Sequence, residues 1–294
     1  MLSAIISLTT VVTLTVTMLA QQQASASNCR VVGKNVPLRE LPEASGVAAS
    51  RRTAGLFWAH NDSGDPVIFG IDSDGAIKNR IRVTGAAVDD WEDIAVGPCP
   101  QGSCMYIADI GDNSGTRKHI TLYRVVEPAP GEAATEPVEA FQAVYPDGPH
   151  DAEALFVSQD SDVFLITKGD PGSVALFRFP RPLASGTPLQ LQRIGEPVAG
   201  PRVEPKNRPT GADISPDGQW VVVRTTDRLT FYRTMDLIVG RWREAFRTDV
   251  TALGERRGEG VTFAANDTLI LVGEAGGVLR GDGTFARLTC TLGR

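Results

Sequence analysis

Apolar and polar residues along this chain form a pattern that repeats five times. Each repeat has an apolar anchor that follows a short polar or glycine-containing segment, and the anchors are Val47, Ile94, Leu155, Ile214 and Val261. A turn and a second apolar run follow each anchor, at residues 56–60, 105–108, 163–167, 220–224 and 269–273. Short runs rich in β-branched and aromatic residues between turns predict paired β-strands.

Further strands complete each repeat. We predict third strands at residues 67–71, 120–125, 174–179, 229–233 and 278–280, and fainter fourth strands at 77–83 and 189–194. The anchors recur every 47 to 61 residues, and four short strands at such a spacing are typical of propeller blades. The sequence therefore predicts an all-β fold, a β-propeller of four-stranded antiparallel blades, with five blades preferred. Six blades stay open, because residues 127–148 and 180–207 could contain weak strands; within them, 127–140 is interpreted as a surface loop of the second blade.

Four cysteines bear on ring closure. They are Cys29, Cys99, Cys104 and Cys290, and they allow three disulfide pairings. Cys99 and Cys104 enclose a tight turn, so we favour a local bridge there and a second bridge from Cys29 to Cys290. The second bridge would hold a strand at residues 30–38 beside residues 284–290 and close the ring. A zinc site is not favoured, because no histidine lies at ligand spacing around these cysteines.

The N-terminal segment predicts export. Residues 1–26 carry no charged side chain and end in a run of small residues. An apolar core before an A-x-A-like site predicts a signal peptide over residues 1–26, with one propeller domain over 27–294. A retained membrane anchor is the alternative, because the apolar stretch approaches the length that spans a bilayer. We expect a secreted or cell-envelope monomer with no membrane span after cleavage.

Composition narrows the function. The chain has 294 residues and a net charge of −6, with 29 Lys and Arg against 35 Asp and Glu. That balance excludes a nucleic-acid partner held by phosphate neutralisation. The chain also lacks a Gly-x-Ser-x-Gly elbow and a phosphate-binding glycine loop, so neither a serine hydrolase nor a nucleotide cofactor is favoured.

Polar residues gather at one end of the predicted inner hairpins. In an antiparallel hairpin the start of the first strand lies beside the end of the second, so residues at both places surround one mouth of the channel. The first group is Glu92, Asp93, His150, Asp151, Glu153, Asp213 and Glu259. The second group is Asn61, Asp62, Asp109, Asp112, Lys168, Arg224 and Glu274. The turns at the other end of the hairpins carry no comparable cluster, and this asymmetry indicates a site.

Clustered carboxylates raise one another's pKa unless a cation offsets them. Oxygen ligands suit a hard divalent ion, with Ca²⁺ favoured over Mg²⁺ or Mn²⁺. The predicted metal ligands are Glu92, Asp109, Asp112, Glu153 and Glu259. The predicted catalytic residues are His150 and Asp151, and the predicted ligand-binding residues are Asn61, Asp62, Lys168, Arg224 and Glu274. For each acid taken singly, the alternative is a structural role in fixing a loop N–H group or pairing a basic neighbour.

Several strings carry a resemblance to a known group. They are Glu-Ala-Ser-Gly-Val at 43–47, Phe-Trp-Ala-His-Asn-Asp-Ser-Gly-Asp at 57–65, Asp-Trp-Glu-Asp-Ile-Ala at 90–95, Ala-Asp-Ile-Gly-Asp-Asn at 108–113, Tyr-Pro-Asp-Gly-Pro-His-Asp-Ala-Glu-Ala-Leu at 145–155 and Thr-Gly-Ala-Asp-Ile-Ser-Pro-Asp-Gly at 210–218. With these strings the chain resembles a group of exported bacterial β-propellers of actinobacterial type. At the level of single blades it is distantly similar to SdiA-regulated and phytase-like esterase propellers. The resemblance implies a propeller fold and export, and the distant one implies a calcium-dependent phosphoester hydrolase.

The function predicted from these observations is a divalent-cation site at the channel mouth that binds, and in its enzymatic form hydrolyses, a small polar or phosphorylated ligand. Two alternatives stay open. One is a non-enzymatic scaffold that binds an extracellular protein or glycan, in which the acids only order loops. The other is a lactonase-like hydrolase. The mouth offers only Lys168 and Arg224 as basic partners, which disfavours a polyphosphorylated substrate.

Overall fold

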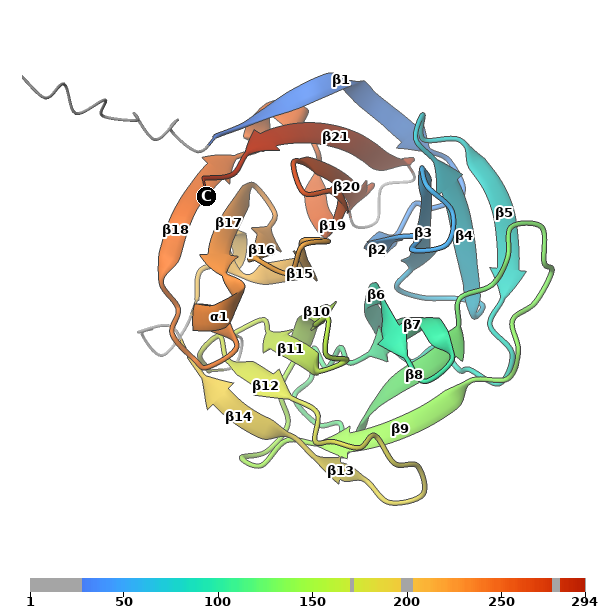
Figure 1. The fold of residues 1–294 in the computed structure, drawn as a ribbon, viewed down its shortest axis with the longest axis vertical. Coiled ribbons are helices and arrows are strands. Elements are labelled where there is room, and N and C mark those ends of the chain that lie inside the picture. The colour runs from blue at the N-terminus through green and yellow to red at the C-terminus, as the bar shows by residue number, and fades with distance from the viewer. Residues whose placement is uncertain (1–27, 170–171, 197–202, 277–280, 294) are drawn as a thin grey trace, which may run out of the picture.

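Five β-sheets stand around a central channel like the blades of a wheel (Figure 1). This arrangement is seen in a computed structural model that describes residues 28–169, 172–196, 203–276 and 281–293. It confirms the predicted all-β propeller and settles the blade number at five. Among the described residues, no helix is long and apolar enough to cross a membrane. The predicted signal peptide, and its alternative as a membrane anchor, lie outside the described residues.

In blades 1 to 4, four antiparallel strands are arranged in chain order from the channel outward. Blade 1 contains β2 (Ala44–Ala49), β3 (Leu56–Asn61), β4 (Val67–Asp72) and β5 (Ile77–Arg82). Blade 2 contains β6 (Trp91–Cys99), β7 (Gly102–Asp109), β8 (Ile120–Val126) and β9 (Glu139–Val144). Blade 3 contains β10 (Ala152–Val157), β11 (Val163–Thr167), β12 (Leu176–Arg178) and β14 (Gln192–Gly195). Blade 4 contains β15 (Pro209–Ile214), β16 (Trp220–Thr225), β17 (Arg228–Arg233) and β18 (Glu244–Asp249).

Blade 5 joins the two ends of the described chain. Its strands are β19 (Arg257–Ala265), β20 (Thr268–Glu274), β21 (Gly283–Thr291) and β1 (Asn28–Leu38). Strand β1 is the outermost strand and pairs with β21, with Cys29 opposite Cys290. The disulfides Cys29–Cys290 and Cys99–Cys104 are both formed, as predicted. The third strand predicted at residues 278–280 falls outside the described residues, and β21 takes the third position.

Two local predictions are corrected. The fourth strand predicted at 189–194 is two strands: β13 (Leu189–Gln190) adds to blade 2 in parallel with β9, and β14 completes blade 3. Leu191 between them is buried, which places the break over the seam between these blades. The loop predicted at 127–140 ends where β9 begins, and its residue Ala134 forms a bridge to Arg82 at the edge of blade 1.

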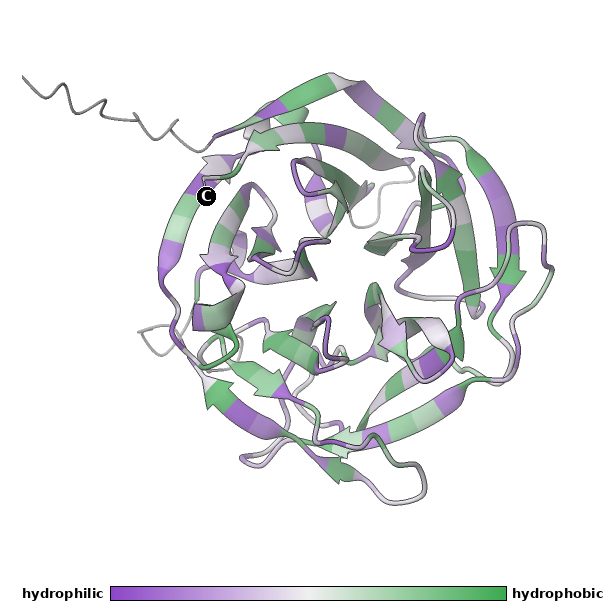
Figure 2. Cartoon of the chain, viewed as in Figure 1, coloured by the Kyte–Doolittle hydropathy of each residue, from purple (hydrophilic) through white to green (hydrophobic). Residues whose placement is uncertain are grey.

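The core lies between neighbouring blades. Inner strands are buried on both faces, whereas outer strands such as β1 and β18 are largely exposed and contain both polar and apolar residues (Figure 2). Phe156 and Phe164 of blade 3 stack at 4.8 Å in the cluster that also holds Val221 of blade 4. Burying a side chain of this size contributes about 1.5–3 kcal/mol. The repeated apolar runs of the sequence therefore form blades that pack against one another around the channel.

Glycines in the repeated segments let the inner strands approach one another. A Cβ atom on Gly46 would lie 2.6 Å from the main-chain N of Ile94, and one on Gly260 would lie 2.5 Å from the main-chain O of Ser45. Such contacts leave no space for any side chain. The glycine in each of these segments is therefore required by close packing around the channel, and it brings the neighbouring acids to one place.

Candidate functional site

A cavity of about 120 Å³ opens at the end of the channel where the inner strands β2, β6, β10 and β19 begin. It is lined by Ala44, Ser45, Asp62, Asp90, Glu92, Asn113, Glu153, Lys168, Arg257, Glu259 and Glu274. These residues come from every blade except blade 4. We call this cavity the acidic mouth, because it holds six carboxylates and two basic side chains.

Most of the lining acids were placed here from sequence. Predicted residues that line the acidic mouth are Asp62, Glu92, Glu153, Lys168, Glu259 and Glu274. Sequence reasoning missed Asp90 and Arg257 as site residues. Each stands two positions before a predicted acid, and side chains two apart share one face of a strand, so this period could have identified both.

The two basic side chains are already paired with acids. Lys168 Nζ lies 3.1 Å from the Asp151 carboxylate and also contacts Glu153. Arg257 lies 2.5 Å from Glu274 and 3.5 Å from Glu259. Four carboxylates thus share two positive charges, and Glu92, Asp62 and Asp90 have no ion-pair partner among the described residues. The acidic mouth keeps an excess of negative charge.

This excess shows in the protonation of the acids. Burial raises the pKa of Glu92 and Glu259 well above the usual value, and repulsion from Glu153 adds to the rise at both. Burial, followed by repulsion from Glu43 and Glu274, raises the pKa of Asp62 to about 7. Burial opposes the charge of Lys168, but attraction to Glu153 and Asp151 outweighs it and raises the pKa of this ammonium.

One subset of these acids has metal-ligand geometry. Carboxylate oxygens of Glu92, Asp151 and Glu153 all lie within 4.8 Å of one another, and all three residues are buried. Oxygen-only ligands of this kind suit Ca²⁺, Mg²⁺ or Mn²⁺. The Lys168 ammonium contacts two of the three, so it supplies the positive charge that a metal ion would otherwise supply.

Asp109 and Asp112 do not line the acidic mouth. The Asp109 carboxylate accepts hydrogen bonds from the main-chain N–H groups of Asp89 and Asp90 and pairs with Arg117 at 2.8 Å. Asp112 accepts hydrogen bonds from the main-chain N–H groups of Thr116 and Arg117, at 2.9 and 2.8 Å. Both carboxylates hold the loop after β7. Their role as metal ligands stays a prediction.

His150, predicted as a catalytic residue, packs among aromatic side chains away from the acidic mouth. Its Nε2 atom lies 2.9 Å from Asp147, and its ring packs edge-on to Tyr145 with centroids 4.9 Å apart. It is not among the residues of the acidic mouth, whereas Asp151 on the same segment reaches Lys168 there. A catalytic role for His150 stays a prediction.

Arg224 and Asn61, predicted to bind a ligand, make internal contacts. The Arg224 side chain is fully buried, pairs with Glu255, and donates to the carbonyl oxygens of Gly260 at 2.7 Å and Val272 at 2.9 Å, which joins blades 4 and 5. The Asn61 side chain accepts a hydrogen bond from the Glu43 N–H group at 3.1 Å. Neither lines the acidic mouth, and contact with a ligand stays a prediction for both.

A second group of carboxylates lies deeper in the channel. Asp93 accepts hydrogen bonds from the N–H groups of Ile94 at 2.9 Å, Leu155 at 2.8 Å and Ala212 at 3.3 Å, and so links blades 2, 3 and 4. Asp213 links blade 4 to blade 5 through Thr262 and Phe263. Burial raises the pKa of Asp93 well above its usual range and that of Asp213 to about 6, while their hydrogen bonds act against this rise. We call these two residues the channel carboxylates.

Comparisons with known proteins define the class. No model of a protein family matches the sequence, and no curated protein matches it. The PQQ-bound aldose sugar dehydrogenase of Streptomyces coelicolor aligns over 90% of this chain and 98% of its own, with 12% identity and a TM-score of 0.55. The allergen Mala s 1 of Malassezia sympodialis aligns over 88% of this chain and 96% of its own, with 9% identity and a TM-score of 0.57. At such low identity these similarities show the fold alone, and the chain is a five-bladed β-propeller protein.

Proposed function

We propose that the acidic mouth binds a divalent cation, Ca²⁺ in the first place, and with it a small polar ligand. The observation that carries this proposal is the charge of the cavity: six carboxylates and two basic side chains surround about 120 Å³. Buried acids that repel one another raise the free energy of the folded state unless protons or a cation neutralise them. A divalent cation gives the largest neutralisation in the smallest volume.

Glu92, Glu153 and Asp151 are the ligands that we assign to this ion, because their oxygens already converge. The Lys168 ammonium then moves away from Glu153, since two cations cannot share the same carboxylate oxygens without repulsion. The ion would supply a Lewis acid that polarises an oxygen of the bound ligand. Glu259 and Glu274 on the facing blade would accept hydrogen bonds from ligand hydroxyl groups.

The same cavity disfavours a phosphorylated ligand. Both of its basic side chains, Lys168 and Arg257, are ion-paired with carboxylates. A phosphate would meet an excess of negative charge with no unpaired basic group among the lining residues. We therefore assign the site to a neutral, hydroxylated ligand, such as a sugar or a lactone.

Hydrolysis is the second candidate function, and one residue favours it. Asp62 lies on the rim of the acidic mouth, and its pKa is raised to about 7. A group with a pKa near the working pH is the most efficient general acid or base. Asp62 would accept the proton of an attacking water as general base, and a bound cation, by offsetting the repulsion from neighbouring acids, would lower the pKa of Asp62 below this value.

Export completes the proposal. The charge-free segment at residues 1–26 and the two disulfides both fit a secreted or cell-envelope protein, because disulfides persist in oxidising compartments. The extracellular space also supplies Ca²⁺ at the concentrations that weak sites require.

Calorimetric titration of Ca²⁺ into chelator-treated protein tests the cation site. We expect about one ion per chain, and a loss of affinity of about tenfold or more in Glu92→Gln. The matched control is Glu132→Gln, because Glu132 is exposed on the loop before β9. Binding that is equal in the wild type and in Glu92→Gln, or no binding at all, would refute the proposal and leave the scaffold alternative.

A further inference from the structure

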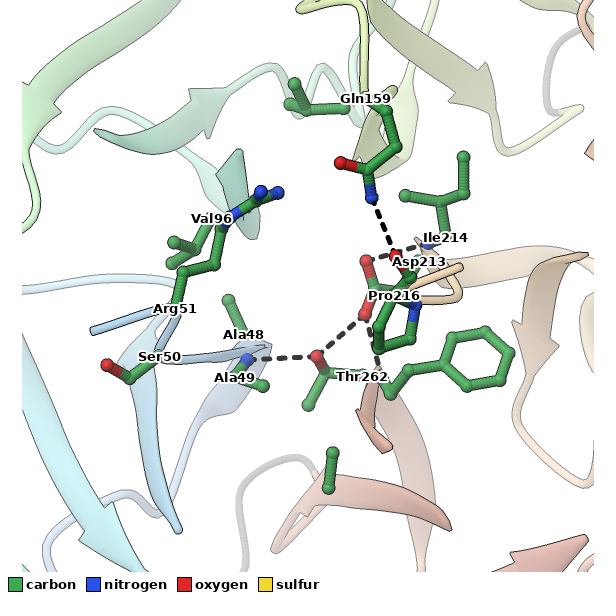
Figure 3. A pocket seen from close by; sticks show the side chains of 13 residues that line it. Ala48, Ala49, Ser50, Arg51, Val96, Gln159, Asp213, Ile214, Pro216 and Thr262 are labelled. Atoms are coloured by element: carbon green, nitrogen blue, oxygen red, sulfur yellow. Dashed lines mark hydrogen bonds between the residues drawn. The ribbon is translucent and has the colours of Figure 1, made fainter. Parts of the chain in front are cut away.

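The opposite end of the channel contains a larger cavity than the acidic mouth. Its volume is about 320 Å³, and all five inner strands contribute to its wall (Figure 3). The apolar part of that wall is Ala48, Val96, Val157, Ile214 and Phe263. An adjoining cavity of about 520 Å³ shares Arg51 with the first and adds Arg52 and Arg287. We call the two cavities together the basic mouth.

The arginines of the basic mouth form no ion pair with a described residue, although the charge of Arg51 acts across the cavity on Asp213. Among the described residues, no carboxylate oxygen forms an ion pair with Arg51, Arg52 or Arg287, although most other arginines and lysines of the described chain have one. Arg52 donates to the main-chain oxygen of Glu127, and Arg287 donates to that of Ser73. Arg51 is exposed, and no hydrogen bond joins its side chain to another residue in the described part of the chain. Guanidinium groups that are held by neutral carbonyl groups, or by none, keep their capacity to bind an anion in a bidentate manner.

A polar pair faces Arg51 across the cavity. Figure 3 shows the Arg51 side chain on one side of the opening and Asp213 with Thr262 on the other. The Thr262 hydroxyl donates to Asp213 at 2.7 Å and accepts from the Ala49 N–H group at 3.0 Å, so its hydrogen-bonding capacity is used. Within the described ranges, Asp213 Oδ1 accepts a single hydrogen bond, from the Ile214 N–H group at 2.8 Å, and a carboxylate oxygen can accept a second one. The cavity thus offers a cation on one side and a free acceptor on the other.

We propose that the basic mouth binds a small hydroxylated polyanion, which carries carboxylate or phosphate groups. One anionic group contacts Arg51, a second reaches Arg52 or Arg287 in the adjoining cavity, and a hydroxyl group donates to Asp213. Cavities of this size take ligands of the size of a sugar or an organic acid. The proposal does not depend on the cation site, because no residue lines both mouths.

The test is calorimetric titration of metal-free protein, dialysed free of chelator, with citrate, tripolyphosphate, inorganic phosphate and glucose. We expect citrate or tripolyphosphate to bind, inorganic phosphate to bind more weakly, and glucose not to bind. Citrate as the tighter ligand assigns the site to carboxylates, and tripolyphosphate assigns it to phosphates. No binding of either polyanion, or equal binding of inorganic phosphate, would overturn the proposal.

Substitution then locates the binding. Arg51→Gln should weaken binding of the polyanion by about tenfold or more, because it removes a charged hydrogen-bond donor. Arg30→Gln is the matched control, since Arg30 is exposed on β1. Because Arg51 lies on an exposed turn, its variant should keep the thermal midpoint of the wild type. Glu92→Gln should bind the polyanion unchanged, so failure of one proposal is distinguished from failure of the other. Unchanged affinity in Arg51→Gln would refute the assignment.

Discussion

The two mouths of one channel are built from the same five inner strands, yet they carry opposite charge. At the start of those strands Glu92, Glu153 and Glu259 converge with too few cations, whereas Arg51 at the other end stands beside two further arginines with no acid paired to them. The two faces of one propeller can therefore carry charge of opposite sign. The charge at the strand starts, which form the acidic mouth, does not determine the charge at the hairpin turns, which form the basic mouth.

Asp93, the channel carboxylate beside Glu92, shows how the fold satisfies a structural acid. Asp93 follows Glu92 directly in sequence, but it accepts three main-chain hydrogen bonds from three blades. Glu92 is just as buried and accepts none of that kind among the described residues. Neighbouring acids of similar burial thus differ in whether the fold itself satisfies them. That difference separates a structural carboxylate from one that is available to a ligand.

The largest effect on stability is expected from removal of Asp93, the structural carboxylate. Asp93→Ala removes the acceptor of the Ile94, Leu155 and Ala212 N–H groups, and each buried group left unpaired costs about 1–3 kcal/mol. We expect a loss of about 3 kcal/mol or more in the free energy of unfolding, measured by urea denaturation. Asp74→Ala on an exposed turn is the control and should change it by less than about 0.5 kcal/mol. A stable Asp93→Ala protein would contradict the distinction drawn here.

Calcium should stabilise the folded protein by binding at the acidic mouth, where Glu92 is available to a ligand. An ion that binds only the folded state stabilises it by about 2.7 kcal/mol at a concentration one hundred times its dissociation constant. We expect the urea midpoint to rise in Ca²⁺ relative to EDTA, and the rise to be absent in Glu92→Gln. Identical midpoints for the wild type in both solutions would count against a cation at the acidic mouth.

Acidity should replace the cation in part. The folded-state pKa values of Asp62, about 7, and Asp213, about 6, lie above the value of 3.8 for a free aspartate, so the folded protein binds more protons than the unfolded one in that window. Stability in EDTA should therefore rise as the pH falls from about 8 to about 6. His60 offsets part of this rise in the same window, because burial lowers its pKa in the folded protein to about 4 while the unfolded histidine is protonated near its usual 6.5. Denaturation at both pH values measures the slope, and a fall in stability toward pH 6 would show the sign to be wrong.

The smallest expected effect is the change in stability when a single acid of the acidic mouth is neutralised. In EDTA, Glu92→Gln should stabilise the protein slightly, since it removes a carboxyl group whose ionised form is opposed by burial and by repulsion from Glu153. The exposed control Glu132→Gln should leave stability unchanged. Thermal denaturation at neutral pH compares the two, and a destabilised Glu92→Gln would place Glu92 with the structural acids.

Sequence predicted the architecture well because the repeat is a physical necessity of the fold. Apolar runs bounded by turns located the inner hairpins, and the position of Cys29 and Cys290 at the chain ends indicated how the ring closes. The break at Leu191 was not predicted. A single buried residue between two strands that join different blades leaves the apolar pattern continuous.

The location of the acidic mouth was predictable from the sequence, but the full set of residues that line it was not. The pairing of the predicted strands placed Glu153 and Glu259 at the same end of the channel without any knowledge of where their side chains point. It could not show that Arg224 turns between two blades toward Glu255, or that the loop of Asp112 supplies its own N–H donors. The basic mouth was missed because Arg51 and Arg52 lie on a segment that has the pattern of a plain turn, and Arg287 on β21 lies far from them in sequence.

The most direct test of the central claim is the anomalous difference map of a crystal grown with Ca²⁺. We predict a single peak in the acidic mouth, at about 2.3–2.6 Å from carboxylate oxygens of Glu92 and Glu153, with the Lys168 ammonium displaced from Glu153. A map with no peak there, and with Lys168 still held by Asp151 and Glu153, would contradict the account.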